Sequence, residues 1–488
     1  MSDALAGPSL PAPTEAAPPA APNGSSTRPR RAARRSPTEL TFRLDEALVD
    51  RSASREPAWL ADDRRAALAR YRELPLESNR LYTPYVDLRP ADLADVTAYE
   101  GQGDQPSAVG IDAVALPPGV AALAELRGDD APALVLDAAA REAGVTVETF
   151  ASLIERDPEA ARRLIADPAS LPADDKLAQL TRAGWSRGLV VRVPDGVRLE
   201  SPVVVRWRSA APGRALLSRT VVDLGDGASA SLVEELAPSG PSIDCAAGEV
   251  VPQSLFTGSL EVVLGRGASL AVASLQEFGP DTVAFQHRNA QIGEGAALHW
   301  ALANLGGRLV RSRVDNRLVG DRSTVEQVEI VFGAEDQLFD LTSRTRHIGR
   351  DTTGNLLSKG ALLDRSRSYM KGLIEIERSA VGTDSYLGEF GMNLSKQTRA
   401  VAIPSLEIDQ PDCRRAAHSS SVGPIDEAQL FYLESRGISP ADARKFIVLG
   451  FLEPVVVRVP LPAAQDRLRE LLEAKWDAGA VAAPAAAA

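Results

Sequence analysis

His418 is a candidate metal ligand, and it lies where a β-like sequence pattern gives way to a helical one. His418 is followed by three serines and, at Asp426, by an acidic residue that can begin a helix. A neutral imidazole nitrogen can bind iron while the other ring nitrogen holds a hydrogen-bond partner. The serines and Asp426 could also suggest a hydrolase triad, but closeness in sequence is not the geometry that a triad needs. No Gly-x-Ser-x-Gly motif is present, so we treat His418 as a candidate ligand or a structural histidine.

The two cysteines of the chain, Cys245 and Cys413, lie far apart and form no Cys-x-x-Cys spacing. Neither a disulfide framework nor a zinc ribbon is therefore predicted, and a reducing cytosol fits this cysteine usage. A cubane iron–sulfur cluster usually takes about four cysteine ligands. The chain alone is thus not predicted to hold a conventional cluster, but it could share a site in which His418 supplies imidazole and a partner supplies a thiolate.

Other candidate sites are weaker. His347 lies in a β-like segment and is predicted to be a solvated or hydrogen-bonded surface residue, while His287 and His299 have no cysteine or paired carboxylate at ligand spacing. The run Gly225-x-Gly227-x-x-Ala230 formally fits a dinucleotide fingerprint, but β-like sequence follows it in place of the required helix. No Gly-x-x-x-x-Gly-Lys-Ser/Thr loop is present, so ATP hydrolysis is not predicted.

The charge balance narrows the choice of partners. The chain of 488 residues has 54 Lys and Arg against 66 Asp and Glu, a net charge of −12. This balance disfavours binding to nucleic acid or to an anionic membrane surface. No apolar run long enough to span a bilayer and no secretory signal pattern is found, so we expect a cytoplasmic protein.

Short apolar runs with turn residues between them continue from Leu189 to about Ile408. Three turns share one form: Gly225-Asp226-Gly227-Ala228, Gly265-Arg266-Gly267-Ala268 and Gly293-Glu294-Gly295-Ala296. Repeated strand, glycine turn, strand units predict a solenoid, since stacked strands bury one continuous apolar interior. We expect a mainly β fold with a right-handed parallel β-helix core, and a pair of β-sandwiches is the alternative.

Five segments are expected along the chain. Residues 1–38 are a disordered Pro- and Ala-rich tail, residues 39–185 a mostly helical N-terminal module, and residues 186–424 the β-helix core. Residues 425–477 form a C-terminal helical module, and residues 478–488 a second disordered tail.

Helical patterns occupy both modules. In the N-terminal module they cover 56–75, 134–143 and 147–166, with a break at Asp157-Pro158. In the C-terminal module Asp426 is expected to cap a first helix that ends near Gly437. Ser439-Pro440 is expected to start a second helix, and a third is expected over 463–476.

One long motif carries a family resemblance. The run from His418 to Ile438, with Val-Gly-x-Ile-Asp-x-x-Gln-Leu-Phe-Tyr-Leu-x-Ser-Arg-Gly-Ile at its end, resembles the C-terminal signature of the SufB/SufD family of iron–sulfur cluster assembly scaffold proteins. Supporting pieces are Glu56-Pro-Ala-Trp-Leu, Lys371-Gly-Leu-Ile with Thr383-Asp384, and Gly450-Phe451. The resemblance runs from about residue 50 to about residue 475.

Within the family the chain is most similar to SufD. SufB-like chains typically carry a sulfur-accepting cysteine about ten residues before the histidine, where this chain has Ile408 and Asp409. His418 matches the SufD histidine that lies at the interface with SufB. SufD-like chains often carry a cysteine two residues before that histidine, but Ala416 stands here, so Cys413 is a second candidate ligand that the alignment alone does not support.

The resemblance implies a non-catalytic subunit of a SufB, SufC and SufD complex, joined to SufB through the β-helix. It implies a transient cluster shared with SufB, reduced flavin in the complex of some relatives, and a cysteine desulfurase as an indirect partner. It also implies a SufC-docking surface made by Asp426, Gln429, Leu430, Phe431, Tyr432, Arg436, Gly437, Phe446, Gly450 and Phe451.

Two alternatives stay open. A SufB-like chain that accepts sulfur directly would need a reactive Cys413 or Cys245. A carbohydrate-processing β-helix enzyme is disfavoured, because such enzymes are usually exported and line their clefts with aromatic residues, which make up 5% of this chain.

Overall fold

The computed structural model of this chain describes residues 35–100, 115–240 and 251–482. Cys245 and most of the expected N-terminal tail lie outside the described residues. A compact unit begins at Ser36. Pro37 already belongs to it, since its carbonyl oxygen accepts a hydrogen bond from the Leu88 amide at 2.7 Å. The compact unit thus begins within the last residues of the tail expected over 1–38.

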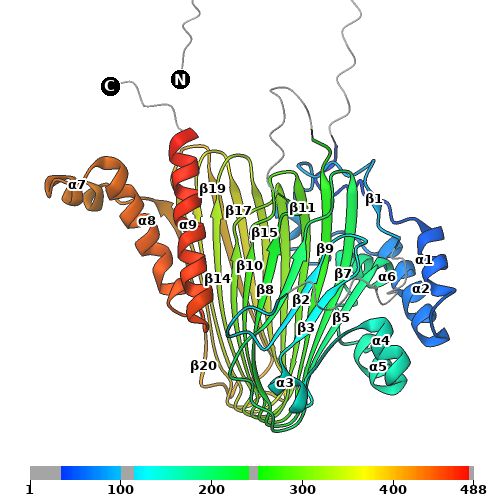
Figure 1. Cartoon of the computed structure of the whole chain (residues 1–488). Helices are drawn as coiled ribbons and strands as arrows, with labels where there is room; N and C mark the ends of the chain where they lie inside the picture. Colours follow the sequence, from blue (N-terminus) through cyan, green and yellow to red (C-terminus); the bar gives the residue numbers. More distant parts are fainter. Residues whose placement is uncertain (1–34, 101–114, 241–250, 483–488) are drawn as a thin grey trace, which may run out of the picture. The chain divides into compact units, whose positions relative to one another are not determined.

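The core of this unit is built from two facing sheets, between which successive strands alternate (Figure 1). Sheet A contains β4 (Thr146–Thr149), β5 (Arg187–Val193), β7 (Arg214–Leu224), β9 (Ser254–Leu264), β11 (Thr282–Ile292), β13 (Leu309–Leu318), β15 (Leu338–His347), β17 (Arg367–Ile376) and β19 (Arg399–Ile408), with β1 (Thr97–Ala98) beside β7. Sheet B contains β3 (Ala133–Leu136), β2 (Ala122–Leu126), β6 (Val203–Arg208), β8 (Ser229–Ala237), β10 (Ser269–Gln276), β12 (Ala297–Asn304), β14 (Thr324–Gly333), β16 (Thr353–Leu362), β18 (Asp384–Asn393) and β20 (Arg415–Pro424).

The pairing of these strands confirms a β-solenoid. From β5 to β19 in sheet A and from β6 to β20 in sheet B, every neighbouring pair is parallel. Among the strand pairs of the described residues, only the first ones, β4 with β5 and β2 with β3, are antiparallel. Apolar side chains from both sheets, such as Leu260 and Leu270, join one buried cluster between them. Parallel coils exclude the β-sandwich alternative, whose sheets are antiparallel.

The three glycine turns stack at one corner of successive coils. Gly227, Gly267 and Gly295 have φ values of +68°, +67° and +64°, a region that is costly for residues with a Cβ atom. The Gly227 amide donates to the Arg266 carbonyl oxygen, and the Gly267 amide to the Glu294 carbonyl oxygen, both at 2.8 Å. Each turn thus hydrogen-bonds to the next, which explains the repeated sequence.

The N-terminal helices are α1 (Glu46–Ala53), α2 (Ala58–Glu73), α3 (Ala138–Glu142), α4 (Phe150–Arg156), α5 (Pro158–Ile165) and α6 (Lys176–Gly184), with a 3-10 turn at Thr83–Tyr85. Leu68 and Leu180 from two of them pack with Leu217 and Phe285 on the outer face of sheet A. The expected break at Asp157-Pro158 is confirmed, since Asp157 caps α5 by accepting from the Ala160 amide.

Two of the expected N-terminal helices begin later than predicted. Residues 133–136 are strand β3 and residues 146–149 are strand β4, so the helical patterns at 134–143 and 147–166 were wrong in their first parts. Both strands pair antiparallel with strands of the sheets. Short apolar runs fit a helix or a strand equally well by periodicity, and pairing with a distant strand decided the outcome.

The C-terminal helices are α7 (Glu427–Ser435), α8 (Pro440–Val456) and α9 (Pro462–Ala482). The predicted caps are confirmed: Asp426 accepts from the Ala428 amide at 2.8 Å, and Ser439 accepts from the Asp442 amide at 3.1 Å. Gly437 follows α7 with φ +84°. The expected tail from residue 478 is corrected, because α9 continues to Ala482 through alanine-rich sequence that favours helix.

Helices α8 and α9 cover the outer face of sheet B, while α7 projects away from the strands (Figure 1). Leu452 and Leu472 pack there with Val328 and Phe332, and Trp476 stacks on Phe332 at 6.4 Å between ring centroids. None of the helices in the described ranges is long and apolar enough to cross a membrane.

Candidate functional site

The last coil of the solenoid, formed by β19 and β20, is the first candidate site. Within the described chain, β19 pairs only with β17 and β20 only with β18. Each sheet therefore ends in a strand with one unpaired edge, whose amide and carbonyl groups can pair with another chain. Every residue of β20 is exposed or half-buried, whereas about half of the residues of β18 and β16, the preceding strands of the same sheet, are buried. We call this end of the solenoid the open coil.

His418 lies on the interior side of the open coil. It is in register with Leu387 of β18, which is in register with Leu356 of β16. Both leucines are buried in one apolar cluster, and side chains of paired residues in parallel strands point to the same side. The imidazole of His418 therefore continues an interior row, but it is exposed because no further coil in the described ranges covers it.

Cys413 lies at the same end of the solenoid, in the loop between β19 and β20. It is a half-buried free thiol, and it packs against the apolar cluster that contains Leu356, Ile374 and Leu387. The structure thus brings both candidate ligands next to one cluster. No group of three or more His, Cys, Asp or Glu residues suited to a metal ion is found in the described part of the chain.

The other histidines are held by hydrogen bonds or burial. His347 is buried, not at the surface as expected, because β15 turns it towards the solenoid interior. Its Nδ1 contacts Thr352 Oγ1 at 2.8 Å and its Nε2 contacts Ser385 Oγ at 3.0 Å. Burial lowers the pKa of His347 to about 4, so the ring is neutral at pH 7.

His287 gains a carboxylate that its sequence surroundings did not indicate. Its Nε2 lies 3.2 Å from Oδ1 of Asp175, the N-cap of α6. Burial lowers the pKa of His299. The described contacts thus give these two histidines no set of metal ligands.

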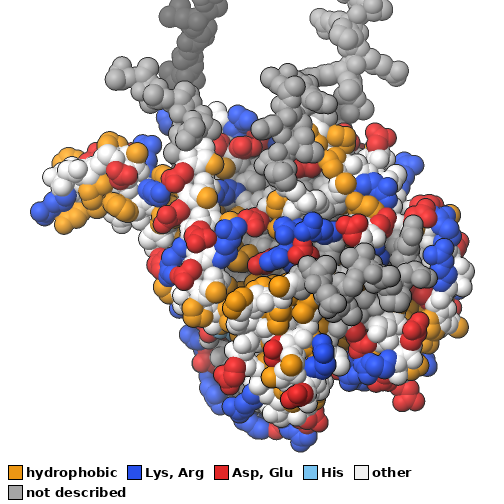
Figure 2. Space-filling view, in the orientation of Figure 1, with side chains coloured by type: hydrophobic (Ala, Val, Ile, Leu, Met, Phe, Trp, Pro, Cys, Tyr) orange, Lys and Arg blue, Asp and Glu red, His pale blue; other side chains and the backbone are white. Residues whose placement is uncertain are grey.

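Helix α7 and the start of α8 expose apolar side chains. Phe431, Tyr432 and Phe446 are 73%, 57% and 58% exposed, and no residue of α7 is buried. Figure 2 shows hydrophobic side chains gathered on this projecting part. Contiguous exposed apolar surface is typical of a protein-interaction site.

The expected docking residues divide into two groups. Gln429, Arg436 and Gly450 are exposed together with the three aromatic residues. Asp426 and Gly437 serve as helix caps, and Leu430 is half-buried. Phe451 is also half-buried, and Lys359 Nζ lies 4.6 Å from the centre of its ring and donates to its carbonyl oxygen at 2.7 Å.

A row of polar side chains in the solenoid interior was missed by the sequence analysis. It occupies one register position through sheet B, namely Glu234, Ser274, Glu329, Ser358, Glu389 and, in the open coil, Ser420, and is interrupted once by Leu302 between Ser274 and Glu329. A glutamate within an apolar strand, as in Val-Glu-Ile-Val-Phe at 328–332, is the signal that could have revealed it.

Two members of this row are buried carboxyl groups with altered acidity. Burial raises the pKa of Glu329 to about 7 and that of Glu389 to about 8. Glu329 accepts from Asn304 Nδ2 at 3.0 Å, and Glu389 accepts from the Ile403 amide of β19 at 3.0 Å. Glu389 is therefore mostly protonated at pH 7 and lies one strand from Ser420.

These features define a class: a parallel β-solenoid with an open terminal coil and C-terminal helices that expose apolar side chains. The sequence model described as "SUF system FeS cluster assembly, SufBD core domain" matches residues 207–451, which is half of the chain. The chain belongs to this family.

Curated relatives support the assignment. An "Iron-sulfur cluster assembly SufBD family protein" of Staphylococcus epidermidis (strain ATCC 12228) is 26% identical over 328 residues, 67% of this chain and 68% of the relative. A protein of the same description from Staphylococcus aureus (strain USA300) is 25% identical over 328 residues with the same coverage. One from Staphylococcus haemolyticus is 26% identical over 297 residues, 61% of this chain and 62% of the relative.

Proposed function

We propose that this chain is a SufD-like, non-catalytic and cytoplasmic subunit of an iron–sulfur cluster assembly scaffold that also contains SufB-like and SufC-like chains. The observation that carries the proposal is the open coil with His418 on its interior side, in a chain of the SufBD family. The unpaired edges of β19 and β20 suit addition of another β-solenoid.

In this proposal the cluster under assembly is cargo and not a resident cofactor. His418 offers one imidazole for it, and the remaining ligands come from the SufB-like subunit, because the described residues contain no complete ligand set. Cys413 is close to the same apolar cluster but half-buried, so it is a weaker candidate. Reduced flavin in the assembled complex and an indirect role for a cysteine desulfurase are further parts of this proposal.

The exposed aromatic residues of α7 and α8 are proposed to dock the SufC-like ATPase, which supplies the energy. To test this, the chain is co-expressed with SufB-like and SufC-like subunits and purified through a tag on this chain. We predict that Phe431→Ser with Phe446→Ser abolishes co-purification of the ATPase and preserves the SufB-like partner. Val457→Ser is the control, because Val457 is also exposed, at 54%, but lies outside the proposed surface. Equal retention of the ATPase by both variants would refute the docking surface.

The role of His418 is tested in the same complex under anaerobic conditions. We predict that His418→Ala leaves the three subunits associated but lowers the iron and sulfide content, while Cys413→Ser has little effect. The opposite result, loss of cluster only in the Cys413 variant, would favour the SufB-like alternative. A stable cluster on the purified single chain would contradict the shared site.

A further inference from the structure

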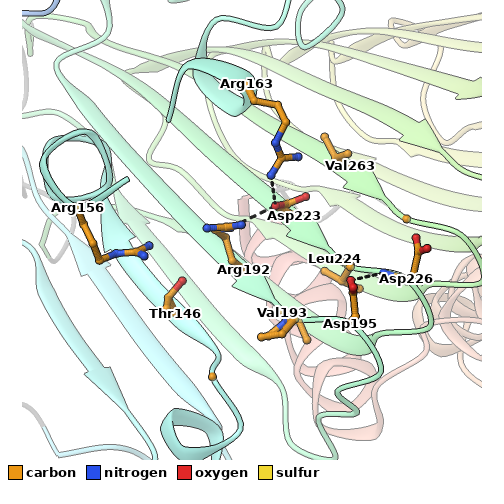
Figure 3. Close-up of a pocket in the computed structure, with 14 residues that line it drawn as sticks. Thr146, Arg156, Arg163, Arg192, Val193, Asp195, Asp223, Leu224, Asp226 and Val263 are labelled. Atoms are coloured by element: carbon orange, nitrogen blue, oxygen red, sulfur yellow. Dashed lines mark hydrogen bonds and ion pairs between the residues drawn. The ribbon is translucent and has the colours of Figure 1, made fainter. Parts of the chain in front are cut away.

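A pocket of about 420 Å³ lies far along the chain from the open coil, on the outer face of sheet A, and is lined by charged side chains together with apolar ones such as Leu224 and Val263. Its base is one register row across four strands, made by Thr146, Arg192, Asp223 and Val263. Figure 3 shows Arg156 and Arg163 reaching over this row from the α4 and α5 side, and Asp195 and Asp226 at the turns. The volume is within the range of pockets that bind small ligands. We call this cavity the arginine pocket.

Two arginines in the pocket share one weakly bound carboxylate. Arg163 Nη2 and Arg192 Nε both contact Oδ2 of Asp223, and both distances are 3.3 Å. Charge-assisted hydrogen bonds are usually about 2.7–2.9 Å long. Asp157 lies 3.7 Å from Arg192 and adds a distant second charge. The guanidinium groups therefore have donor capacity that a better-placed oxyanion could use.

Well-matched arginines elsewhere in the chain show the contrast. Arg365 contacts both carboxylate oxygens of Asp336 at 2.7 Å, and Arg219 contacts those of Glu261 at 2.8 and 2.7 Å. These are two-point pairs in which each oxygen has its own donor. In the arginine pocket, by contrast, Arg163 and Arg192 both donate to the same oxygen of Asp223.

A buried hydroxyl group adds an independent observation. Thr146 Oγ1 is buried and has no hydrogen-bond partner in the part of the chain that the structure describes. Thr146 is in register with Arg192 on the neighbouring strand. Arg156 beside them is held in place by Glu148, which its guanidinium contacts through Nε at 3.3 Å and through Nη2. The guanidinium groups thus face the pocket, and the unpartnered Thr146 hydroxyl lies beneath its lining.

The opposite end of the pocket is acidic. Asp195 Oδ1 accepts from the Asp226 amide at 2.8 Å, and Asp226 accepts from the Arg266 amide and side chain at 2.8 and 2.7 Å. Gly225 permits this close stacking, because a Cβ atom there would lie 2.1 Å from Asp195 Oδ1. Carboxylates at this end favour hydroxyl donors on a ligand, and the arginines at the other end favour an oxyanion.

We propose that the arginine pocket binds a small phosphate monoester with a hydroxylated carbon skeleton. The phosphate contacts Arg163 and Arg192 in place of the long contacts to Asp223. Hydroxyl groups of the skeleton donate to the carboxylates of Asp195 and Asp226. A sugar phosphate and a nucleoside monophosphate share this chemistry.

The test is isothermal titration calorimetry of the full chain, without partner subunits, using ribose 5-phosphate, AMP and ribose. We expect saturable one-site binding of at least one phosphate ester and none of ribose. Comparable affinity for both esters indicates a sugar phosphate site, and tighter binding of AMP indicates that the base contributes. Binding of ribose alone, or no saturable binding of either ester up to millimolar concentration, would overturn the proposal.

Substitutions assign the binding to the pocket. We expect Arg192→Gln and Arg163→Gln each to weaken binding roughly tenfold or more, because each removes a charge-assisted hydrogen bond. Arg346→Gln is the matched control, since Arg346 lies in the same register row of sheet A but outside the pocket.

Unfolding midpoints verify that each variant is folded. Arg163→Gln is expected to perturb folding less than Arg192→Gln, because Arg163 lies at the surface of α5. Equal affinity of all three variants would contradict the proposal.

Discussion

Buried charged groups in this solenoid are accommodated in two ways at the scale of single residues. Arg219 and Glu261 are both fully buried and form a two-point ion pair, to which Ser259 Oγ adds a hydrogen bond at 2.6 Å. Glu329 and Glu389 form no ion pair with a described residue, and burial raises their pKa values to about 7 and about 8. Pairing keeps Arg219 and Glu261 charged, whereas at pH 7 Glu389 is mostly protonated and Glu329 about half protonated.

The raised pKa of Glu389 makes stability depend on pH. In the unfolded chain a glutamate has a pKa of about 4.3, so the folded state binds this proton more tightly. The resulting stabilisation is complete below about pH 4.3 and is lost as the pH rises through about 8. Between pH 5 and pH 9 we expect the free energy of unfolding of the wild type, measured relative to that of Glu389→Gln, to decrease by on the order of 3–5 kcal/mol.

Urea denaturation at several pH values measures this difference. Glu407→Gln is the control, because Glu407 is exposed on β19 at the same end of the solenoid. A difference between wild type and Glu389→Gln that does not change with pH would show that Glu389 is ionised throughout this range.

The Arg219–Glu261 pair predicts a large effect of removing one partner. Glu261→Ala leaves the buried guanidinium without its carboxylate, so we expect a loss of about 3–5 kcal/mol in the free energy of unfolding. Asp336→Ala removes the carboxylate from an exposed pair of similar geometry and should cost less than about 1 kcal/mol. Chemical denaturation of both variants tests the contrast, and equal losses would argue against burial as the cause.

At the scale of elements, the turns set how the coils stack. The corner that carries Gly227, Gly267 and Gly295 continues in later coils with Arg322 and Asp351, whose φ values are also positive, at 58° and 54°. The positive φ at this corner therefore persists in coils whose turns no longer carry glycine there. This explains why the repeated turn sequence was visible in only part of the solenoid.

Gly227→Ala tests the cost of this geometry without a steric clash. A Cβ atom at Gly227 would have nothing within 4 Å, so only the positive φ opposes the substitution. We expect a loss of about 1–2 kcal/mol in the free energy of unfolding. Gly423→Ala is the control, because that site is equally open but has no positive φ, and we expect a change within about 0.5 kcal/mol. Equal effects at the two sites would exclude the backbone explanation.

At the scale of the compact unit, helices cover both outer faces of the solenoid while one end stays open. The N-terminal helices bury the outer side of sheet A, and α8 and α9 bury that of sheet B. Uncovered strands are left mainly at β19 and β20. This distribution leaves exposed strand edges at the open coil and exposed apolar side chains on α7, the two surfaces that we propose bind partners.

A chain that ends at Pro424 should lose the cover of sheet B. Apolar side chains including Val328, Ile330 and Phe332 would then face solvent. We expect increased binding of a hydrophobic dye and concentration-dependent association, measured by fluorescence and light scattering. A chain that ends at Ala482 keeps the described helices and should behave as the full chain does. A monomeric chain 1–424 without dye binding would show that α8 and α9 serve only for docking.

Local sequence determined much of this fold. The glycine turns, the strands between Leu189 and Ile408, the break at Asp157-Pro158 and the caps at Asp426 and Ser439 were all predictable, because turns and caps depend on residues only a few positions apart. The motif from His418 to Ile438 likewise indicated the family, which the match over residues 207–451 confirms.

Tertiary structure decided which of these residues meet. Neighbouring strands of one sheet are separated in sequence by about one full coil. Their register therefore places distant residues in one row, such as Glu329 and Glu389 in sheet B. In sheet A it does the same for Thr146, Arg192 and Asp223. No local pattern encodes that register, which depends on burial of alternate side chains throughout the sheets. For the same reason only the structure showed that β3 and β4 are strands, that His347 is buried, and that the arginine pocket exists.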